Sequence, residues 1–150
     1  MESLLKSTIS KRPDFYRVTA GTIVLCFIAL WTIVNINRFG EYDTFKHSLL
    51  SQPFPAWFNE TLLHLVPAAE LIVMVLLLFN PSRKAGLYLS LGLMLCYTVY
   101  ILLMLSKVFG ITPCSCSSPI AGLNWVQHLW FNLTLSALAA LGLFLHQKAT

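Results

Sequence analysis

Two cysteines separated by one residue are the side chains best suited to carry chemistry in this sequence. Cys114 and Cys116 lie in a short polar stretch that begins at Pro113 and ends at Pro119, between two long apolar runs. Two thiols this close can form a strained, easily reduced disulfide, or they can bind a soft cation such as Cu(I) together. The spacing therefore predicts a redox-active dithiol, with a thiolate metal site and a structural disulfide as alternatives.

The other two cysteines, Cys26 and Cys96, each fall near the middle of an apolar run. A buried cysteine behaves as a small hydrophobic side chain, so we interpret both as packing residues. The two are expected at similar depth, and they could touch if their runs are neighbours in the fold. The sequence leaves open whether they pair.

Glu70 is a carboxyl group within an otherwise apolar run, and it is the strongest polar signal after the cysteines. Such a group is costly in hydrocarbon unless it is neutral or paired, so it is a functional candidate by default. Pro67, three residues earlier, lacks a backbone donor and could kink the helix beside it. Glu70 is therefore predicted either to relay protons or to make a hydrogen bond between helices.

Two histidines are expected just beneath the cysteine pair. His64 and His128 each lie about one to two helical turns inside the end of an apolar run, where one turn rises by about 5.4 Å. A histidine there could take a proton from a cysteine and stabilise the thiolate. Asn132 follows His128 by four residues on the same helical face and can hydrogen-bond across helices. The alternative is that these are ordinary polar residues at the headgroup level.

The predicted site therefore has a catalytic and a supporting set of residues. One cysteine would react as a thiolate and the other would resolve the mixed disulfide. His128 would help the thiolate form, and Glu70 with Asn132 would be a buried relay. The catalytic set is Cys114, Cys116, His128 and Glu70, and the supporting set is His64, Asn132, Gln127 and Pro67.

Composition indicates a membrane protein. The 150 residues are 57% hydrophobic and 11% charged, against roughly 45–50% and 25% in soluble domains. The apolar residues form four blocks, each near the roughly 20 residues that a spanning helix needs. The predicted spans are 18–36, 57–79, 85–108 and 124–145. The first lacks a small-x-small cleavage site, so we expect it to remain as a span.

Short connectors between these blocks predict antiparallel neighbours, and hence one all-α, four-helix membrane domain over residues 1–150. Between the first two spans, apolar residues recur at helical spacing, and Pro53 and Pro55 follow them. This pattern predicts a short interfacial helix in the first exterior loop. The residues that define it are Tyr42, Phe45, Leu49 and Leu50.

The basic residues predict the orientation. Seven of them flank one side of the spans and three the other, and the richer side is expected in the cytoplasm. This predicts a multi-pass membrane protein with both termini in the cytoplasm and with Cys114 and Cys116 facing the exterior or the periplasm, which is the oxidising side. The net charge of +4 forms no basic stripe, so we expect lipid and not nucleic acid as a partner. The seven are Lys6, Lys11, Arg12, Arg17, Arg83, Lys84 and Lys148, and the three are Arg38, Lys46 and Lys107.

Several aromatic residues lie at the expected exterior ends of the spans. Trp57, Trp125 and Trp130 could line a quinone pocket, which needs aromatic walls and nearby polar groups. An aromatic belt at the membrane interface needs the same residues and is much commoner.

These features resemble the MauE/DoxX group of redox-associated membrane proteins. The resemblance covers about residues 16–145 and depends most on Val66-Pro67-Ala68-Ala69-Glu70 and on the Cys-x-Cys pair before the last span. The stretch from Asn124 to Asn132 adds to it, whereas Ser117-Ser118 departs from the glycine or aromatic residue that relatives often carry. The four-span arrangement is also similar to that of quinone-linked four-helix disulfide oxidases, but this chain lacks their Cys-x-x-Cys spacing.

The resemblance implies a protein of the bacterial inner membrane with a role in maturing periplasmic proteins, as in methylamine utilisation. With the dithiol, it predicts thiol/disulfide exchange with a thioredoxin-like or other periplasmic thiol protein. One alternative is a quinone-linked oxidoreductase of the DoxX/DoxD type, for which quinone would be the cofactor. Another is a non-enzymatic assembly subunit in which the disulfide is structural.

Overall fold

The computed structural model describes residues 2–108 and 124–149, and the side chains of residues 14–108 and 124–148. The described residues form helices and their connections, in agreement with the predicted all-α fold. In chain order, the helices are α1 (Glu2–Gly40), α2 (Tyr42–Leu50), α3 (Ala56–Leu78), the 3₁₀ turn η1 (Asn80–Ser82), α4 (Arg83–Leu105) and α5 (Trp125–Ala149).

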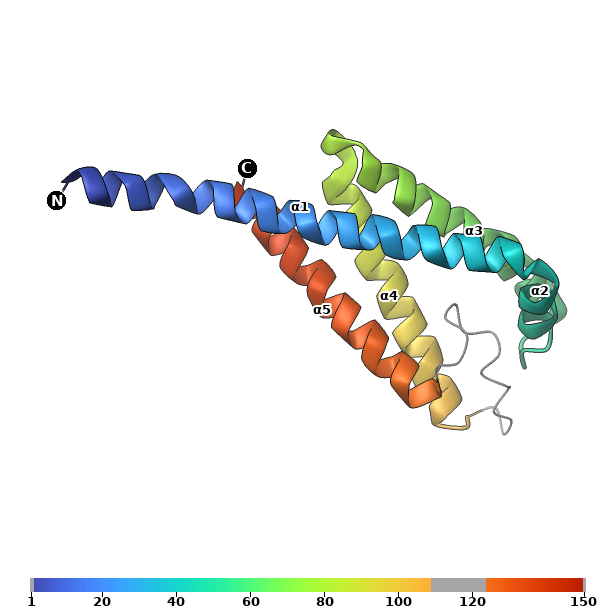
Figure 1. Ribbon diagram of the computed structural model, residues 1–150. Coiled ribbons are helices and arrows are strands. Elements are labelled where there is room, and N and C mark those ends of the chain that lie inside the picture. Colours follow the sequence, from blue (N-terminus) through green and yellow to red (C-terminus); the bar gives the residue numbers. More distant parts are fainter. Residues whose placement is uncertain (1, 109–123, 150) are drawn as a thin grey trace.

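Four of these helices, namely α1, α3, α4 and α5, are long and apolar enough to cross a membrane. Consecutive long helices run antiparallel, so the chain forms a four-helix bundle (Figure 1). In it, α1 packs against α3 and α5, α4 packs against α3 and α5, and α1 and α4 lie diagonally opposite each other. The prediction of a four-helix membrane bundle is confirmed.

The first helix is much longer than the predicted span of 18–36. It runs without interruption from Glu2 to Gly40, and a helix of that length rises by about 58 Å, nearly twice the roughly 30 Å hydrocarbon thickness. Its N-terminal part extends beyond the other helices (Figure 1). Its C-terminal part carries Arg38 into the bundle, where that residue is buried. Arg38 lies beyond the predicted end of this span at residue 36, where it was expected as a flanking basic residue.

The helix that corresponds to the third predicted span, about 85–108, ends three residues earlier than that span. Helix α4 stops at Leu105, and Lys107 has a φ of 52°. This left-handed conformation is incompatible with a continuing α-helix. The residues between Val108 and Asn124 lie outside the described part of the chain.

Large apolar side chains fill the centre of the bundle. Phe27, Trp31, Leu77 and Leu87 are essentially inaccessible to solvent. The Trp31 indole Nε1 donates a hydrogen bond to Ser90 Oγ at 3.1 Å, which joins α1 to α4 and satisfies a buried donor.

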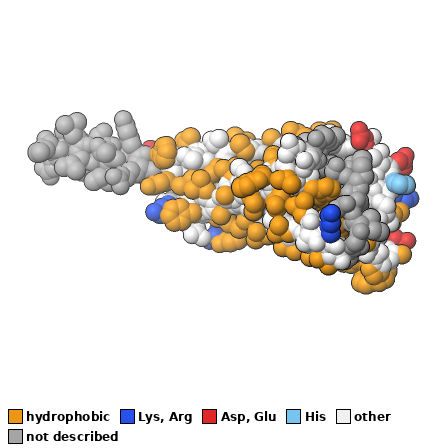
Figure 2. Space-filling model, turned by 90° about the horizontal axis from the view of Figure 1, so that it is seen from below, with side chains coloured by type: hydrophobic (Ala, Val, Ile, Leu, Met, Phe, Trp, Pro, Cys, Tyr) orange, Lys and Arg blue, Asp and Glu red, His pale blue; other side chains and the backbone are white. Residues whose placement is uncertain are grey.

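The outer surface suits a lipid environment. Hydrophobic side chains cover the length of the bundle, and charged side chains gather toward its two ends (Figure 2). Cys26 and Cys96 belong to this surface, because both are exposed and neither is bonded. Our interpretation of them as buried packing residues is therefore wrong, and their positions on the diagonal helices α1 and α4 explain why they do not pair.

The predicted short helix between the first two spans is present as α2. Residues 51–55, which we call the connector, link it to α3. Tyr100 Oη of α4 donates a hydrogen bond to Gln52 Oε1 at 2.6 Å. Asn59 Nδ2 of α3 donates to the carbonyl oxygens of Gln52 and Phe54. These bonds satisfy buried polar groups and hold the connector against the bundle.

The two ends of the bundle differ. Both termini lie toward the end that also carries η1, whereas α2, the end of α4 and the start of α5 lie at the other end (Figure 1). Arg83 and Lys84 therefore belong to the same end as the termini, as the charge pattern predicted. Which end faces the cytoplasm stays a prediction.

A glycine sets the approach of α4 to α3. A Cβ atom on Gly86 would lie 2.8 Å from Leu77 Cδ2 and 3.1 Å from the Leu77 backbone nitrogen. We expect Gly86→Ala to lower the free energy of unfolding by about 1–3 kcal/mol through overpacking. Gly92→Ala on the same helix is the control, because its Cβ would meet nothing within 4 Å. Thermal unfolding in detergent measures both, and equal midpoints would contradict the close approach.

Candidate functional site

A buried ion pair joins the first two spanning helices. Arg38 Nη2 of α1 lies 3.1 Å from Glu70 Oε1 of α3, and the two side chains are 7% and 0% exposed. Tyr97 Oη of α4 donates a hydrogen bond of 2.6 Å to the same carboxylate oxygen. Glu70 is thus the meeting point of three helices.

The pair explains how Glu70 can be buried in an apolar span. An isolated charge there would be very costly, whereas a cation in contact with it offsets part of the desolvation penalty. Of the two roles predicted for Glu70, its contacts correspond to the interhelical one. Its partners are Arg38 and Tyr97, and no contact with Asn132 is observed among the described residues.

Each member of the pair keeps one atom without a partner. Among the described residues, neither Glu70 Oε2 nor Arg38 Nη1 makes a hydrogen bond, although both atoms are buried. The guanidinium carbon of Arg38 lies 4.4 Å from the centre of the Phe45 ring, which is a cation–π distance. One side of the guanidinium thus faces an aromatic ring, and Nη1 is a buried donor without a hydrogen-bond partner among the described residues.

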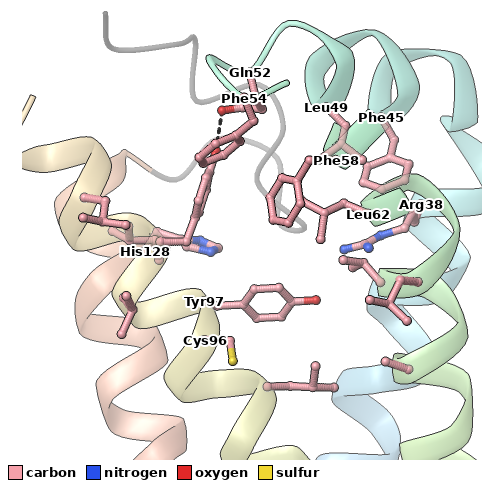
Figure 3. A pocket seen from close by; sticks show the side chains of 18 of the residues that line it. Arg38, Phe45, Leu49, Gln52, Phe54, Phe58, Leu62, Cys96, Tyr97 and His128 are labelled. Carbon is pink, nitrogen blue, oxygen red and sulfur yellow. Dashed lines mark hydrogen bonds between the residues drawn. The ribbon is translucent and has the colours of Figure 1, made fainter. Parts of the chain in front are cut away.

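Arg38 and Tyr97 line a cavity of about 640 Å³, whereas Glu70 is not part of its wall. Aromatic and aliphatic side chains from α2, the connector, α3, α4 and the start of α5 form most of this wall. Figure 3 shows the Arg38 guanidinium and the His128 imidazole directed into the cavity from opposite sides. The cavity is therefore apolar over most of its wall and has a few polar groups at defined places, as ligand sites commonly do.

His128 and Asn132 share the inner face of α5. His128 is buried and lines the cavity. Asn132, one turn further along, is also buried, and its Nδ2 has no hydrogen-bond partner among the described residues. Ser136 continues the same face and donates to the Asn132 carbonyl oxygen at 2.8 Å. The polar face predicted from the four-residue spacing thus points into the bundle.

His64, by contrast, is not brought to this site. It is exposed on α3 and does not line the cavity. The predicted arrangement of two histidines at one place is therefore not observed. Pro67 is buried within α3, which remains one helix from Ala56 to Leu78.

Gln127 has a local structural role that the sequence analysis did not recognise. Its Oε1 accepts a hydrogen bond from Asn124 N at 3.0 Å, and Asn124 Oδ1 accepts one from Val126 N at 2.9 Å. These two bonds resemble a capping box, with the Asn124 side chain bonded to the second helical residue in place of the third, and they satisfy backbone donors at the start of α5. Gln127 thereby fixes where α5 begins, next to His128.

Cys114 and Cys116 lie outside the described residues. The helices before and after them contribute Leu103, close to the end of α4, and Trp125, the first residue of α5, to the cavity wall. The cavity is therefore formed in part by residues close to both ends of the segment that carries the pair.

Arg38 is the main site residue that the sequence analysis missed. The predicted first span ends at residue 36, so Arg38 lies outside it and counts there only as a flanking basic residue. A usable signal was present in the spacing of Trp31, Asn35 and Arg38, which share one helical face. All three are buried in the structure.

The fold and this site define a multi-pass membrane protein with a buried ion pair beside an aromatic cavity. The family model described as methylamine utilisation protein MauE matches residues 16–145, and the chain belongs to this family. The match supports the MauE part of the resemblance and does not bear on the DoxX part. No curated protein and no solved structure matches the chain.

The ion pair makes a prediction about stability. Arg38→Leu or Glu70→Leu alone should lower the free energy of unfolding by about 3–5 kcal/mol, because each leaves a buried charge without its partner. The double variant should recover most of that loss. Thermal unfolding in detergent measures all three, with Glu60→Leu as the control at an exposed carboxylate of α3. A double variant no more stable than the single ones would contradict the pairing.

Proposed function

We propose that this MauE-family protein carries out thiol/disulfide exchange through Cys114 and Cys116. Its partner is a thioredoxin-like or other periplasmic thiol protein, and its role is in the maturation of periplasmic proteins of the methylamine-utilisation type. The observation that supports this most is the position of His128. It lies in the first turns of α5, directly after the segment with the cysteine pair, and faces the cavity.

The exchange needs no external electron acceptor. One cysteine loses its proton to His128 and attacks the disulfide of the partner, which forms a mixed disulfide and releases one partner thiolate. The second cysteine then attacks the mixed disulfide as a thiolate. The partner leaves with two thiols, and a Cys114–Cys116 disulfide has formed. Two electrons have passed from the pair to the partner, and the reverse sequence transfers them back.

Glu70 fits this scheme as a positioning residue. It does not line the cavity, and it holds Arg38 and Tyr97, which do. The guanidinium and the phenol are thereby kept at fixed places in the wall opposite His128. This role replaces the relay with Asn132.

The distribution of basic residues supports the proposed orientation in the bacterial inner membrane. Because Arg38 is buried against Glu70, we do not count it among the free basic residues at the α2 end. The balance then becomes seven against two, Lys46 and Lys107, which favours cytoplasmic termini more strongly. The cysteine pair would then face the periplasm, where disulfides persist.

The redox state of the pair tests the function. In a Cys26→Ala/Cys96→Ala background, acid trapping of intact cells followed by a mass-adding maleimide should reveal both oxidised and reduced Cys114/Cys116. Of the two single variants Cys116→Ser and Cys114→Ser, the one that keeps the attacking thiol and lacks the resolving thiol should accumulate mixed disulfides with other proteins, and the other should not. A pair that stays fully oxidised in all growth conditions and forms no mixed disulfide would instead identify a structural disulfide.

His128 makes a separate prediction. His128→Gln should slow mixed-disulfide formation with a thioredoxin-like protein at neutral pH by about tenfold or more, because the thiol loses its proton acceptor. Raising the pH should restore the rate, since the thiolate then forms without help. His64→Gln is the matched control at an exposed histidine of α3. A rate loss that persists at alkaline pH would mean that His128 acts only through the fold.

A further inference from the structure

We propose that the aromatic cavity binds an isoprenoid quinone, with a ring carbonyl accepting a hydrogen bond from Arg38. This binding site is inferred from the cavity alone. It needs no thiol exchange, so it can be present whether or not Cys114 and Cys116 react. Binding is the whole proposal, and no electron-transfer step is part of it.

The polar end of the ligand is indicated by Arg38. Its side chain is 7% exposed and lines the cavity, and its buried Nη1 has no hydrogen-bond partner among the described residues. A buried donor left unsatisfied is costly, and a ligand acceptor placed in the cavity would remove that cost. A ligand that presents an acceptor oxygen to the guanidinium is therefore favoured over one that does not.

The charge of the site favours a neutral acceptor. Glu70 lies 3.1 Å from Arg38 and already balances its positive charge. A carboxylate or phosphate ligand would add a second negative charge to this pair within an apolar wall, where like charges repel strongly. A carbonyl oxygen uses the Nη1 donor without adding charge. This excludes fatty acids and phospholipid headgroups as good ligands.

The wall next to Arg38 suits a planar ring. Phe45 lies 4.4 Å from the guanidinium carbon, so a ring bonded to Nη1 would be close to another ring. Phe58, Tyr97 and Tyr100 also line the cavity. Figure 3 shows the rings of Phe54, Phe58 and Tyr97 around it. Aromatic walls of this kind stack on flat, neutral groups. An aliphatic chain would gain little from these rings beyond the burial of its apolar surface area.

His128 adds a second polar group on the far wall. Its imidazole and the Arg38 guanidinium are directed into the cavity from opposite sides (Figure 3). A quinone carries two carbonyl groups at opposite positions of its ring. A ring held by Arg38 would therefore turn its second carbonyl toward the side of the cavity that His128 occupies.

The remaining wall fits the tail. Three residues line the cavity and are also exposed on the outer surface, namely Leu65 of α3 and Val99 and Leu103 of α4. The cavity thus reaches the lipid-facing surface between these two helices, where an isoprenoid tail can leave toward the bilayer. The volume of about 640 Å³ lies within the roughly 300–1,000 Å³ of typical ligand pockets.

Equilibrium binding of ubiquinone-2 to the full-length protein in detergent tests the proposal. The fully substituted ring does not add to thiols, and Cys114→Ser/Cys116→Ser can serve as the background so that thiol exchange plays no part. Quenching of tryptophan fluorescence should be saturable, since Trp125 lines the cavity. Ala69→Phe should abolish saturable quenching because Ala69 lies in the wall, and Ala68→Phe should not because Ala68 is exposed on the next position of α3.

Two further measurements refine the test. Competitors show whether the cavity recognises the quinone ring or only the tail, and Arg38→Lys shows whether binding needs the guanidinium donor or only a positive charge. Farnesol, which has the tail without the ring, and oleate should each fail to displace ubiquinone-2 at equal concentration. Arg38→Lys keeps a cation beside Glu70 and shortens the donor arm, and it should weaken binding about tenfold with the unfolding midpoint retained. If Arg38→Lys does not fold, the Ala69 and Ala68 variants and the competitors still show whether ubiquinone-2 binds in the cavity.

A cysteine in the wall supplies an independent readout. Ubiquinone-2 should slow alkylation of Cys96 by N-ethylmaleimide at least threefold and leave Cys26 unchanged, because both thiols are exposed but only Cys96 lines the cavity. Equal, unsaturable quenching in all variants would mean partition into the micelle only. Displacement by farnesol or oleate would make the cavity an acyl-chain or fatty-acid site. Each of these results would overturn the proposal.

Discussion

The buried contact between Arg38 and Glu70 is the interaction on which the rest of this structure depends. Two opposite charges at 3.1 Å, with side chains 7% and 0% exposed, are far more favourable together than either is alone in an apolar bundle. The contact requires α1 to continue beyond the apolar run, and it requires α1 and α3 to meet at one depth. Tyr97 then adds α4 to the same carboxylate. The neighbour relationships of three helices follow from satisfying a single buried charge.

The cavity is a consequence of the same contact. The salt bridge uses one nitrogen of the guanidinium and leaves Nη1 without a partner among the described residues. Phe45 lies at a cation–π distance from the guanidinium carbon, and the connector after α2 is held by Tyr100 and Asn59. The result is an aromatic space with a charge-balanced donor in its wall. Such a space discriminates by hydrogen bonding and shape, because net charge has already been removed.

The cavity lies where α4 ends and α5 begins, and the cysteine pair falls between these two helices in the sequence. The dithiol segment connects α4 to α5, and the cavity wall includes residues of both helices close to that segment. Membership of the MauE family is consistent with a redox role and leaves its partner to be identified. The thiol pair and the cavity can be separated experimentally, since binding in the cavity requires no cysteine chemistry. His128 is the residue that would belong to both.

The amino-acid sequence by itself determined the presence of four spans, the short helix before the second span and the need of Glu70 for a partner. These follow from the local run of apolar residues and from the cost of one charge in hydrocarbon, and neither depends on which helices are neighbours. Only the tertiary structure decided that the partner is Arg38, that His64 faces outward while His128 faces inward, and that Cys26 and Cys96 are apart. Each of these depends on where a helix ends and which faces meet, and packing between distant segments determines both.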